Sequence, residues 1–315
     1  MDKVNILQIG SYPDWDMEAL EKNFILHPYF SAEDKDVFIA GCADSIRGVA
    51  TRGDLGLSRK LIEALPYLEI ISVYGVGYDG VDLDAARERN IRVTNTPDVL
   101  TKDVADFGVA MMLAASRGII EAEEWVRSGD WAQKGMYPLN TRVFGKRVGI
   151  LGLGRIGYEI AKRCAAFEMD IGYSDVEKKE YASDFKYIQD PRALAEHSDY
   201  LFVTVTGGAA TQHIVNKAVI EALGPEGMLL NISRASNIDE EALLVALENK
   251  TLGYAALDVF EGEPDLNSRF LELDNVMLQP HQASGTVDTR KAMGRLVREN
   301  LEAYFSGREL LTPVI

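Results

Sequence analysis

The feature that most constrains the fold is a run of glycines with the spacing Gly-x-Gly-x-x-Gly, formed by Gly152, Gly154 and Gly157. The apolar segment 147–151 precedes the run, and a helical pattern over 160–167 follows it. In this order the first glycine permits a tight turn, the second lets the backbone approach a phosphate, and the third allows a helix to pack closely on a strand. The N-terminus of the helix also attracts an anion. The run predicts a Rossmann-like domain that binds a dinucleotide.

The next apolar segment, residues 170–174, ends at Asp175, about 20 residues after the glycines. A carboxylate at this position accepts hydrogen bonds from the adenosine ribose and repels a 2′-phosphate, so it favours NAD. Lys178 and Lys179 follow closely and are able to pair with that phosphate. NAD is therefore the favoured cofactor, and NADP stays open.

Apolar and helix-like segments alternate along the rest of the chain, which favours parallel sheets with helices on both faces. A chain of 315 residues exceeds the ~250–300 at which one core stops growing, so two domains are expected. In the first hundred residues we expect strands at 4–9, 37–40, 48–50, 69–73 and 91–93, and helices at 16–24, 58–65 and 84–89. A long helix is expected to begin near Thr101, and a last helix is expected over 286–305.

Three polar side chains follow apolar segments in the second half of the chain, where open α/β sheets place their ligands. Arg234 comes after the segment 228–233, Glu263 lies in the loop that follows 254–257, and His281 comes after 276–280. Each residue alone also fits an ordinary structural role, such as a surface arginine or a histidine that caps a turn. Together, beyond one dinucleotide motif, they favour catalysis.

The chemistry that these residue types support is reduction of a ketone. Hydride addition turns the carbonyl oxygen into an alkoxide, which needs a proton donor and nearby positive charge. Histidine exchanges its proton near neutral pH, so His281 suits the role of general acid. Glu263 is the carboxylate expected to orient the ring, and Arg234 is suited to a substrate carboxylate and carbonyl oxygen.

The composition excludes several classes of protein. The chain carries 33 basic and 49 acidic side chains, a formal net charge of -16, whereas nonspecific binding to nucleic acid or anionic membranes needs a basic surface. Cys42 and Cys164 lack metal-ligand spacing, so neither a disulfide framework nor a metal site is expected. The sequence shows no signal-peptide pattern and no apolar run near the ~20 residues of a membrane span. We expect a soluble, cytoplasmic protein.

These motifs are similar to those of the D-isomer-specific 2-hydroxyacid dehydrogenase family. The resemblance rests on the glycine run and on residues 74–79, 95–101, 231–234, 257–264 and 280–281. Residues 284–286 and 289–293 look most like glyoxylate/hydroxypyruvate reductases and hydroxyphenylpyruvate reductases.

The resemblance implies two doubly wound α/β domains with parallel sheets. A flavodoxin-like substrate domain would comprise residues 1–99 and 285–315, and a Rossmann-like dinucleotide domain residues 100–284. In this family the active site lies between the two domains.

The resemblance also implies roles for individual residues. Arg234, Glu263 and His281 would be catalytic, and the backbone amides of Val76 and Gly77 would hold the substrate carboxylate. Further substrate and cofactor contacts are expected at Arg52, Arg155, Ile156, Val205, Thr206, Ile232, Ser233 and Asp258.

Relatives usually form homodimers, and the segment 125–137 matches the arm that wraps the partner. Met136 or Tyr137 would then reach the partner's site, and the alternative is an aromatic cluster within one chain. The sequence departs from the commonest family pattern at Ser233, Ala235, Ser236, 206–208 and Gln282, which bears on pocket size and cofactor preference.

The expected function is NAD(P)H-dependent reduction of a small 2-oxo acid, such as glyoxylate or hydroxypyruvate, to the D-2-hydroxy acid. Two alternatives stay open. One is a reductase of a bulkier 2-oxo acid, such as hydroxyphenylpyruvate or 2-ketogluconate. The other is a dinucleotide-sensing protein similar to the corepressors that share this fold. Formate dehydrogenases are disfavoured, because they typically carry glutamine at the position of Glu263.

Overall fold

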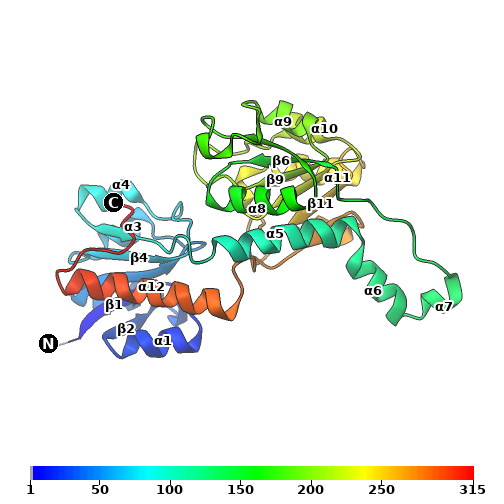
Figure 1. The fold of residues 1–315 in the computed structure, drawn as a ribbon. Helices are drawn as coiled ribbons and strands as arrows, with labels where there is room; N and C mark the ends of the chain where they lie inside the picture. The colour runs from blue at the N-terminus through cyan, green and yellow to red at the C-terminus, as the bar shows by residue number, and fades with distance from the viewer. Residues whose placement is uncertain (1–2) are drawn as a thin grey trace. The chain divides into compact units, whose positions relative to one another are not determined.

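A computed structural model describes residues 3–315, and the chain forms two compact units. Unit 2 is continuous and comprises Thr101–Ala283, whereas unit 1 joins the chain up to Leu100 with Ser284–Ile315. In Figure 1 unit 1 is therefore drawn in blue and cyan with a red helix, and unit 2 in green to orange. No helix within residues 3–315 is both long enough and apolar enough to cross a bilayer.

Unit 1 contains a five-stranded parallel sheet in the order β2-β1-β3-β4-β5. Its strands are β1 (Val4–Gln8), β2 (Phe24–Pro28), β3 (Ile46–Arg52), β4 (Ile70–Tyr74) and β5 (Arg92–Thr94). Its helices are α1 (Asp14–Glu21), α2 (Lys35–Cys42), α3 (Arg59–Glu63), α4 (Leu83–Glu88) and α12 (Val287–Phe305).

Helices cover both faces of this sheet. Successive side chains of each strand point to opposite faces, so each face contributes its own set of residues to the packing. Leu7, Val49 and Ile71 pack in one cluster with residues of α2, α3 and α4. On the opposite face α12 packs on β4, and the Ser72 hydroxyl donates to the Val297 carbonyl at 3.5 Å. The unit is therefore doubly wound.

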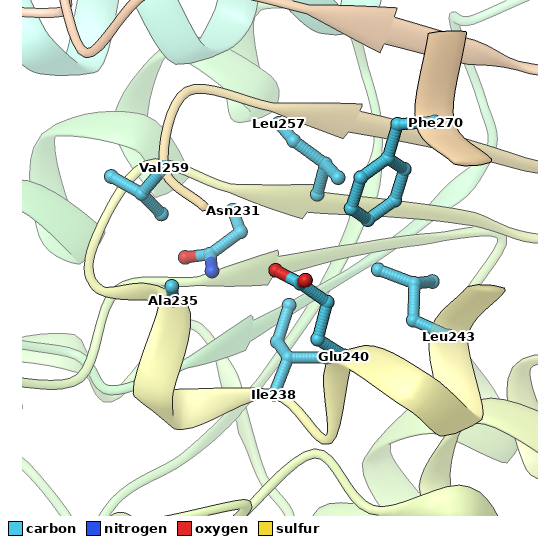
Figure 2. Close-up of a pocket in the computed structure, with 8 residues that line it drawn as sticks. All are labelled: Asn231, Ala235, Ile238, Glu240, Leu243, Leu257, Val259 and Phe270. Atoms are coloured by element: carbon cyan, nitrogen blue, oxygen red, sulfur yellow. The ribbon is translucent and has the colours of Figure 1, made fainter. Parts of the chain in front are cut away.

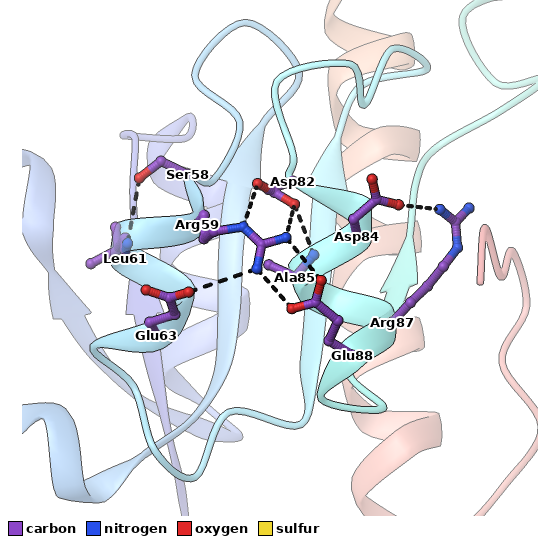
Figure 3. A network of polar contacts seen from close by, with 9 residues as sticks. All are labelled: Ser58, Arg59, Leu61, Glu63, Asp82, Asp84, Ala85, Arg87 and Glu88. Carbon is purple, nitrogen blue, oxygen red and sulfur yellow. Dashed lines mark hydrogen bonds and ion pairs between the residues drawn. The ribbon is translucent and has the colours of Figure 1, made fainter.

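A network of ion pairs around Arg59 joins α3 to α4 on the surface of unit 1 (Figure 3). The guanidinium lies 2.7 Å from Glu88 and 3.3 Å from Asp82, and its hydrogen bond lowers the pKa of the Glu88 carboxyl. Asp82 also caps α4 by accepting from the Ala85 amide. These contacts fix the two short helices against each other.

Two details of the expected secondary structure were wrong. Residues 37–40, expected as a strand, lie inside α2, because Asp34 accepts hydrogen bonds from the amides of Asp36 and Val37 and so begins a helix there. The helix expected over 16–24 ends at Glu21, and Phe24 begins β2.

Unit 2 contains a seven-stranded parallel sheet in the order β12-β11-β10-β9-β6-β7-β8. Its strands are β6 (Arg147–Leu151), β7 (Asp170–Ser174), β8 (Lys186–Tyr187), β9 (Tyr200–Val203), β10 (Met228–Asn231), β11 (Tyr254–Leu257) and β12 (Val276–Leu278). Its helices are α5 (Thr101–Ser116), α6 (Ile119–Arg127), α7 (Asp130–Lys134), α8 (Arg155–Ala166), α9 (Pro191–His197), α10 (Lys217–Leu223) and α11 (Glu240–Glu248).

The sheet of unit 2 is also doubly wound. Leu201 and Leu229 pack in a cluster with residues of α9, α10 and α11, whereas Phe202 lies near Gly108 of α5 on the other face. Because every strand is parallel, their carboxyl ends share one edge, and the loops that follow β6, β9, β10, β11 and β12 gather there.

Candidate active site

The glycine run forms the turn between β6 and α8. Gly152 has a φ of +96°, a backbone conformation that residues other than glycine rarely adopt. A Cβ on Gly157 would lie 2.2 Å from the Gly152 carbonyl oxygen, so only glycine allows the helix to approach this closely. A Cβ on Gly154 would meet no atom of the described residues within 4 Å, which leaves that side of the turn open. This geometry fits a dinucleotide pyrophosphate at the N-terminus of α8.

Asp175 follows β7 directly and is tied to the glycine turn. Its carboxylate accepts a hydrogen bond from the Leu153 amide at 2.9 Å and lies 3.2 Å from the Lys179 ammonium. Lys179 also pairs with Glu177 at 3.4 Å. Of the two lysines expected to compete for a 2′-phosphate, Lys179 is thus held by two carboxylates.

Hydrogen bonds from Asn231 build the turn that carries Arg234. The Asn231 side-chain amide donates to the Arg234 carbonyl at 2.9 Å, and its oxygen accepts from the Ser233 amide and hydroxyl. Asn237 bridges this turn to the loop after β9 by donating to the Ser233 hydroxyl and the Val205 carbonyl. Val205 in turn lies against Gly152. Four positions proposed for cofactor or catalysis thus share one edge of the sheet.

Glu263 and His281 lie on the loops that follow two neighbouring strands, β11 and β12. The Nδ1 atom of His281 is 2.6 Å from Oε2 of Glu263, within hydrogen-bonding distance. The other Glu263 oxygen accepts from the Phe260 amide at 2.7 Å, which fixes the carboxylate. Both side chains stay partly exposed, so a ligand is able to reach the ring.

Asp258 anchors the loop that carries His281. Its side chain is almost completely buried, and its carboxylate accepts from the amides of Gln282 and Ala283 at 2.8 and 2.9 Å. Burial raises the pKa of this carboxyl. We expected Asp258 only as a cofactor contact, and the structure adds the function of anchoring the loop that carries the histidine.

A second acid, Glu240 at the start of α11, anchors the loop of Glu263 and was not anticipated from the sequence. Its carboxylate accepts from the Glu261 amide at 2.9 Å, and burial raises its pKa. Figure 2 shows this carboxylate pointing into a small pocket. The pocket is lined by Asn231, Ala235, Ile238, Glu240, Leu243, Leu257, Val259 and Phe270. The only sequence signal was its place after the N-cap Asp239.

The expected substrate residues of unit 1 lie at the carboxyl ends of β3 and β4. Arg52, the last residue of β3, pairs in register with Tyr74, the last residue of β4. The loop that follows β4 is held by Asn95, whose side chain donates to the Val76 carbonyl at 2.8 Å, and by Thr96, whose hydroxyl accepts from the Gly75 amide. The backbone around Val76 and Gly77 is therefore well supported.

The remaining expected residues take their places in unit 2. Arg155 and Ile156 begin α8, Ile232 is buried after β10, and the Thr206 carbonyl accepts from the Thr211 hydroxyl. The arm 125–137 carries an aromatic contact within the chain, because the rings of Trp125 and Tyr137 lie 5.7 Å apart. Met136, by contrast, is 85% exposed.

The comparisons identify the family of this arrangement. The family model for the NAD binding domain of the D-isomer specific 2-hydroxyacid dehydrogenases matches residues 109–283, more than half of the chain. The chain belongs to this family.

Similar proteins in the family cover its whole length. Hydroxyphenylpyruvate reductase of Plectranthus scutellarioides is 45% identical over 315 residues, which are 100% of this chain and 100% of that protein. The structure of a 2-hydroxyacid dehydrogenase from Ketogulonicigenium vulgare Y25 has 63% identity and a TM-score of 0.93, covering 100% of this chain and 99% of that chain. An NADPH-dependent glyoxylate/hydroxypyruvate reductase from Sinorhizobium meliloti, in complex with NADP and malonate, has 41% identity and a TM-score of 0.91, covering 99% and 97%.

Membership of the D-2-hydroxyacid dehydrogenases confirms the recognition made from the sequence motifs. It also confirms the fold class, two α/β units with parallel sheets, and the enzyme class, an oxidoreductase that uses NAD or NADP. The roles of individual site residues stay predictions.

Proposed function

We propose that this dehydrogenase reduces a small 2-oxo acid, with glyoxylate and hydroxypyruvate as its substrates, to the D-2-hydroxy acid. The observation that carries the proposal is the 2.6 Å contact between His281 and Glu263, in the same unit as the glycine turn. The reductase from Sinorhizobium meliloti supports the choice of substrate.

Each catalytic residue has one task in this proposal. The reduced nicotinamide supplies the hydride when the cofactor is bound. His281 donates a proton to the developing alkoxide, and Glu263 keeps its ring oriented. Arg234 stabilises the negative charge on the substrate, because a guanidinium stays protonated.

The substrate carboxylate is assigned to the backbone amides of Val76 and Gly77. Two successive backbone amides in one loop are donors of the kind that bind an anion. The hydrogen bonds from Asn95 and to Thr96 support this assignment, since they fix the loop before a substrate arrives. Arg52 at the neighbouring strand end is the further substrate contact.

For the cofactor we propose a preference for NAD over NADP, read by Asp175. The carboxylate lies directly after β7, and Lys179 is paired with it and with Glu177. The NADPH-dependent relative from Sinorhizobium meliloti makes the opposite preference the main competing outcome.

We further propose a homodimer that uses the arm around α6 and α7. Met136 is 85% exposed and Leu139 97% exposed, and Trp131 is also exposed on this arm. Apolar side chains that are this exposed favour burial against a second copy of the chain.

The test is a panel of steady-state rates on glyoxylate, hydroxypyruvate, hydroxyphenylpyruvate and 2-ketogluconate, each with NADH and NADPH. We expect the highest kcat/KM on the first two. A clear preference for the bulkier acids would replace the proposed substrate. Turnover below about one per second on every acid, despite tight cofactor binding, would favour a sensor over an enzyme of ordinary rate.

A further inference from the structure

Arg52 is paired with an acid two residues along the chain. Its Nε atom donates to Asp54 Oδ1 at 3.0 Å, and its Nη2 atom donates to Asp54 Oδ2 at 2.6 Å. These two parallel contacts occupy one edge of the guanidinium, in the geometry by which arginine binds a carboxylate. Asp54 therefore takes the place that a carboxylate of a ligand would take on this edge.

The pair sits beside the loop that we assign to the substrate carboxylate. The Gly53 amide donates to the Tyr74 carbonyl at 3.2 Å, and a Cβ on Gly75 would lie 3.3 Å from Gly53. The Arg52 carbonyl accepts from the amides of Leu55 and Gly56, which closes the turn that presents Asp54. The turn with the ion pair is thus packed on the start of the loop 75–77.

The exposure of the pair argues against a role in holding the fold. The side chain of Arg52 is 42% exposed and that of Asp54 is 29% exposed, and exposed ion pairs contribute little to stability. The turn itself is closed by backbone hydrogen bonds. A local acid in this place acts mainly on charged ligands, because it neutralises the arginine and repels a second carboxylate.

We propose that Asp54 is a specificity-determining residue, which restricts the enzyme to 2-oxo acids with one carboxylate and a neutral tail. It does so by occupying one edge of the Arg52 guanidinium, so that only the other edge is left for the substrate, and by opposing a second negative group on the substrate. The inference rests on the proposed function, because it assumes a 2-oxo acid bound at the loop 75–77.

The test compares hydroxypyruvate with oxaloacetate, which carries a carboxylate in place of the terminal hydroxyl group. Asp54→Asn keeps the shape of the side chain and removes its charge. We expect the ratio of kcat/KM for oxaloacetate to that for hydroxypyruvate to rise about tenfold, since a like charge is removed and Arg52 becomes available. The double variant Arg52→Gln/Asp54→Asn should lose that gain.

Asp84→Asn is the matched control. Asp84 pairs with Arg87 at 3.0 Å in the same unit, so this variant removes the same charge from another exposed ion pair. Its ratio should stay within twofold of the wild-type ratio.

The outcomes test the role of Asp54 and the proposed function separately. A wild-type enzyme that reduces hydroxypyruvate, with an unchanged ratio in Asp54→Asn, would overturn the role of Asp54 and leave the function standing. A wild-type protein that reduces no 2-oxo acid would instead overturn the proposed function. Asp54→Ser serves as a second variant if Asp54→Asn does not fold, and failure of both to fold would make Asp54 a structural residue and reject the inference.

Discussion

Replacing His281 by asparagine removes the proton donor and disturbs the backbone and the contact with Glu263 as little as possible. His281 has a φ of +49°, and asparagine tolerates this left-handed conformation better than alanine does. An asparagine amide is also able to donate a hydrogen bond to Glu263, so the carboxylate keeps a partner. The variant changes one property above all, because asparagine cannot deliver a proton near neutral pH.

The size of the effect follows from that single loss. General acid catalysis by a positioned side chain contributes about 100- to 10,000-fold to the rate, which corresponds to about 3 to 5 kcal/mol of activation free energy. We expect kcat for His281→Asn to fall within this range. The dissociation constant of the dinucleotide should change less than about twofold, because its contacts are assigned to the glycine turn.

The assay is single-turnover reduction of glyoxylate, followed by nicotinamide absorbance, with cofactor binding measured by titration. His213→Asn is the matched control, since His213 also has a positive φ of +50° and lies 4.0 Å from a carboxylate, that of Glu261. A His281→Asn enzyme that keeps more than a third of the wild-type rate would refute the general-acid role. An equal loss in both variants would show that the effect is structural.

Three further predictions test other parts of the molecule. Gly157→Ala forces a Cβ to within 2.2 Å of the Gly152 oxygen, and overpacking of about 1–3 kcal/mol should lower the Tm by about 2–12 °C; an unchanged Tm in calorimetry would contradict this. Asp175→Ala should raise the ratio of kcat/KM for NADPH to that for NADH about tenfold, and a constant ratio would remove Asp175 from cofactor selection. Burial raises the pKa of Asp16, so its contribution to stability is lost as pH rises from the ordinary carboxyl value through the raised one. Asp16→Asn should therefore gain stability relative to wild type in urea unfolding as the pH rises above the ordinary carboxyl value of about 4, and parallel curves would speak against this.

The sequence predicted those features that depend on local pattern and on the rule for strand ends. The glycine run, the strands before Glu263 and His281, and the two parallel sheets all follow from segments that can be read one at a time. Residues 37–40 show the limit, because a run of four apolar residues does not distinguish a strand from a helix. The helix begins there because the Asp34 carboxylate accepts hydrogen bonds from the amides of Asp36 and Val37.

The supporting acids could not be predicted for a different reason. Asp258 and Glu240 act on backbone amides of loops that lie 21 to 25 positions away, at Gln282, Ala283 and Glu261. Such contacts depend on the path of two loops in space, and a single sequence carries no periodic signal for that path. Asp54 and Arg52 are only two positions apart. Whether their side chains point toward each other depends on the conformation of the turn, which the sequence alone does not show.

The division of unit 1 into two distant stretches has a consequence for how the polypeptide matures on the ribosome. Residues 101–283 hold a complete sheet and can collapse as soon as they emerge. The strands of unit 1 are completed later, because their partners lie at the end of the chain. Helix α12 packs on β4, the Tyr74 hydroxyl donates to the Arg290 carbonyl, and the Val314 amide donates to the Val93 carbonyl. Until residues 284–315 are synthesised, one face of the early sheet lacks its cover, so the first hundred residues complete their fold only after the rest of the chain has been made.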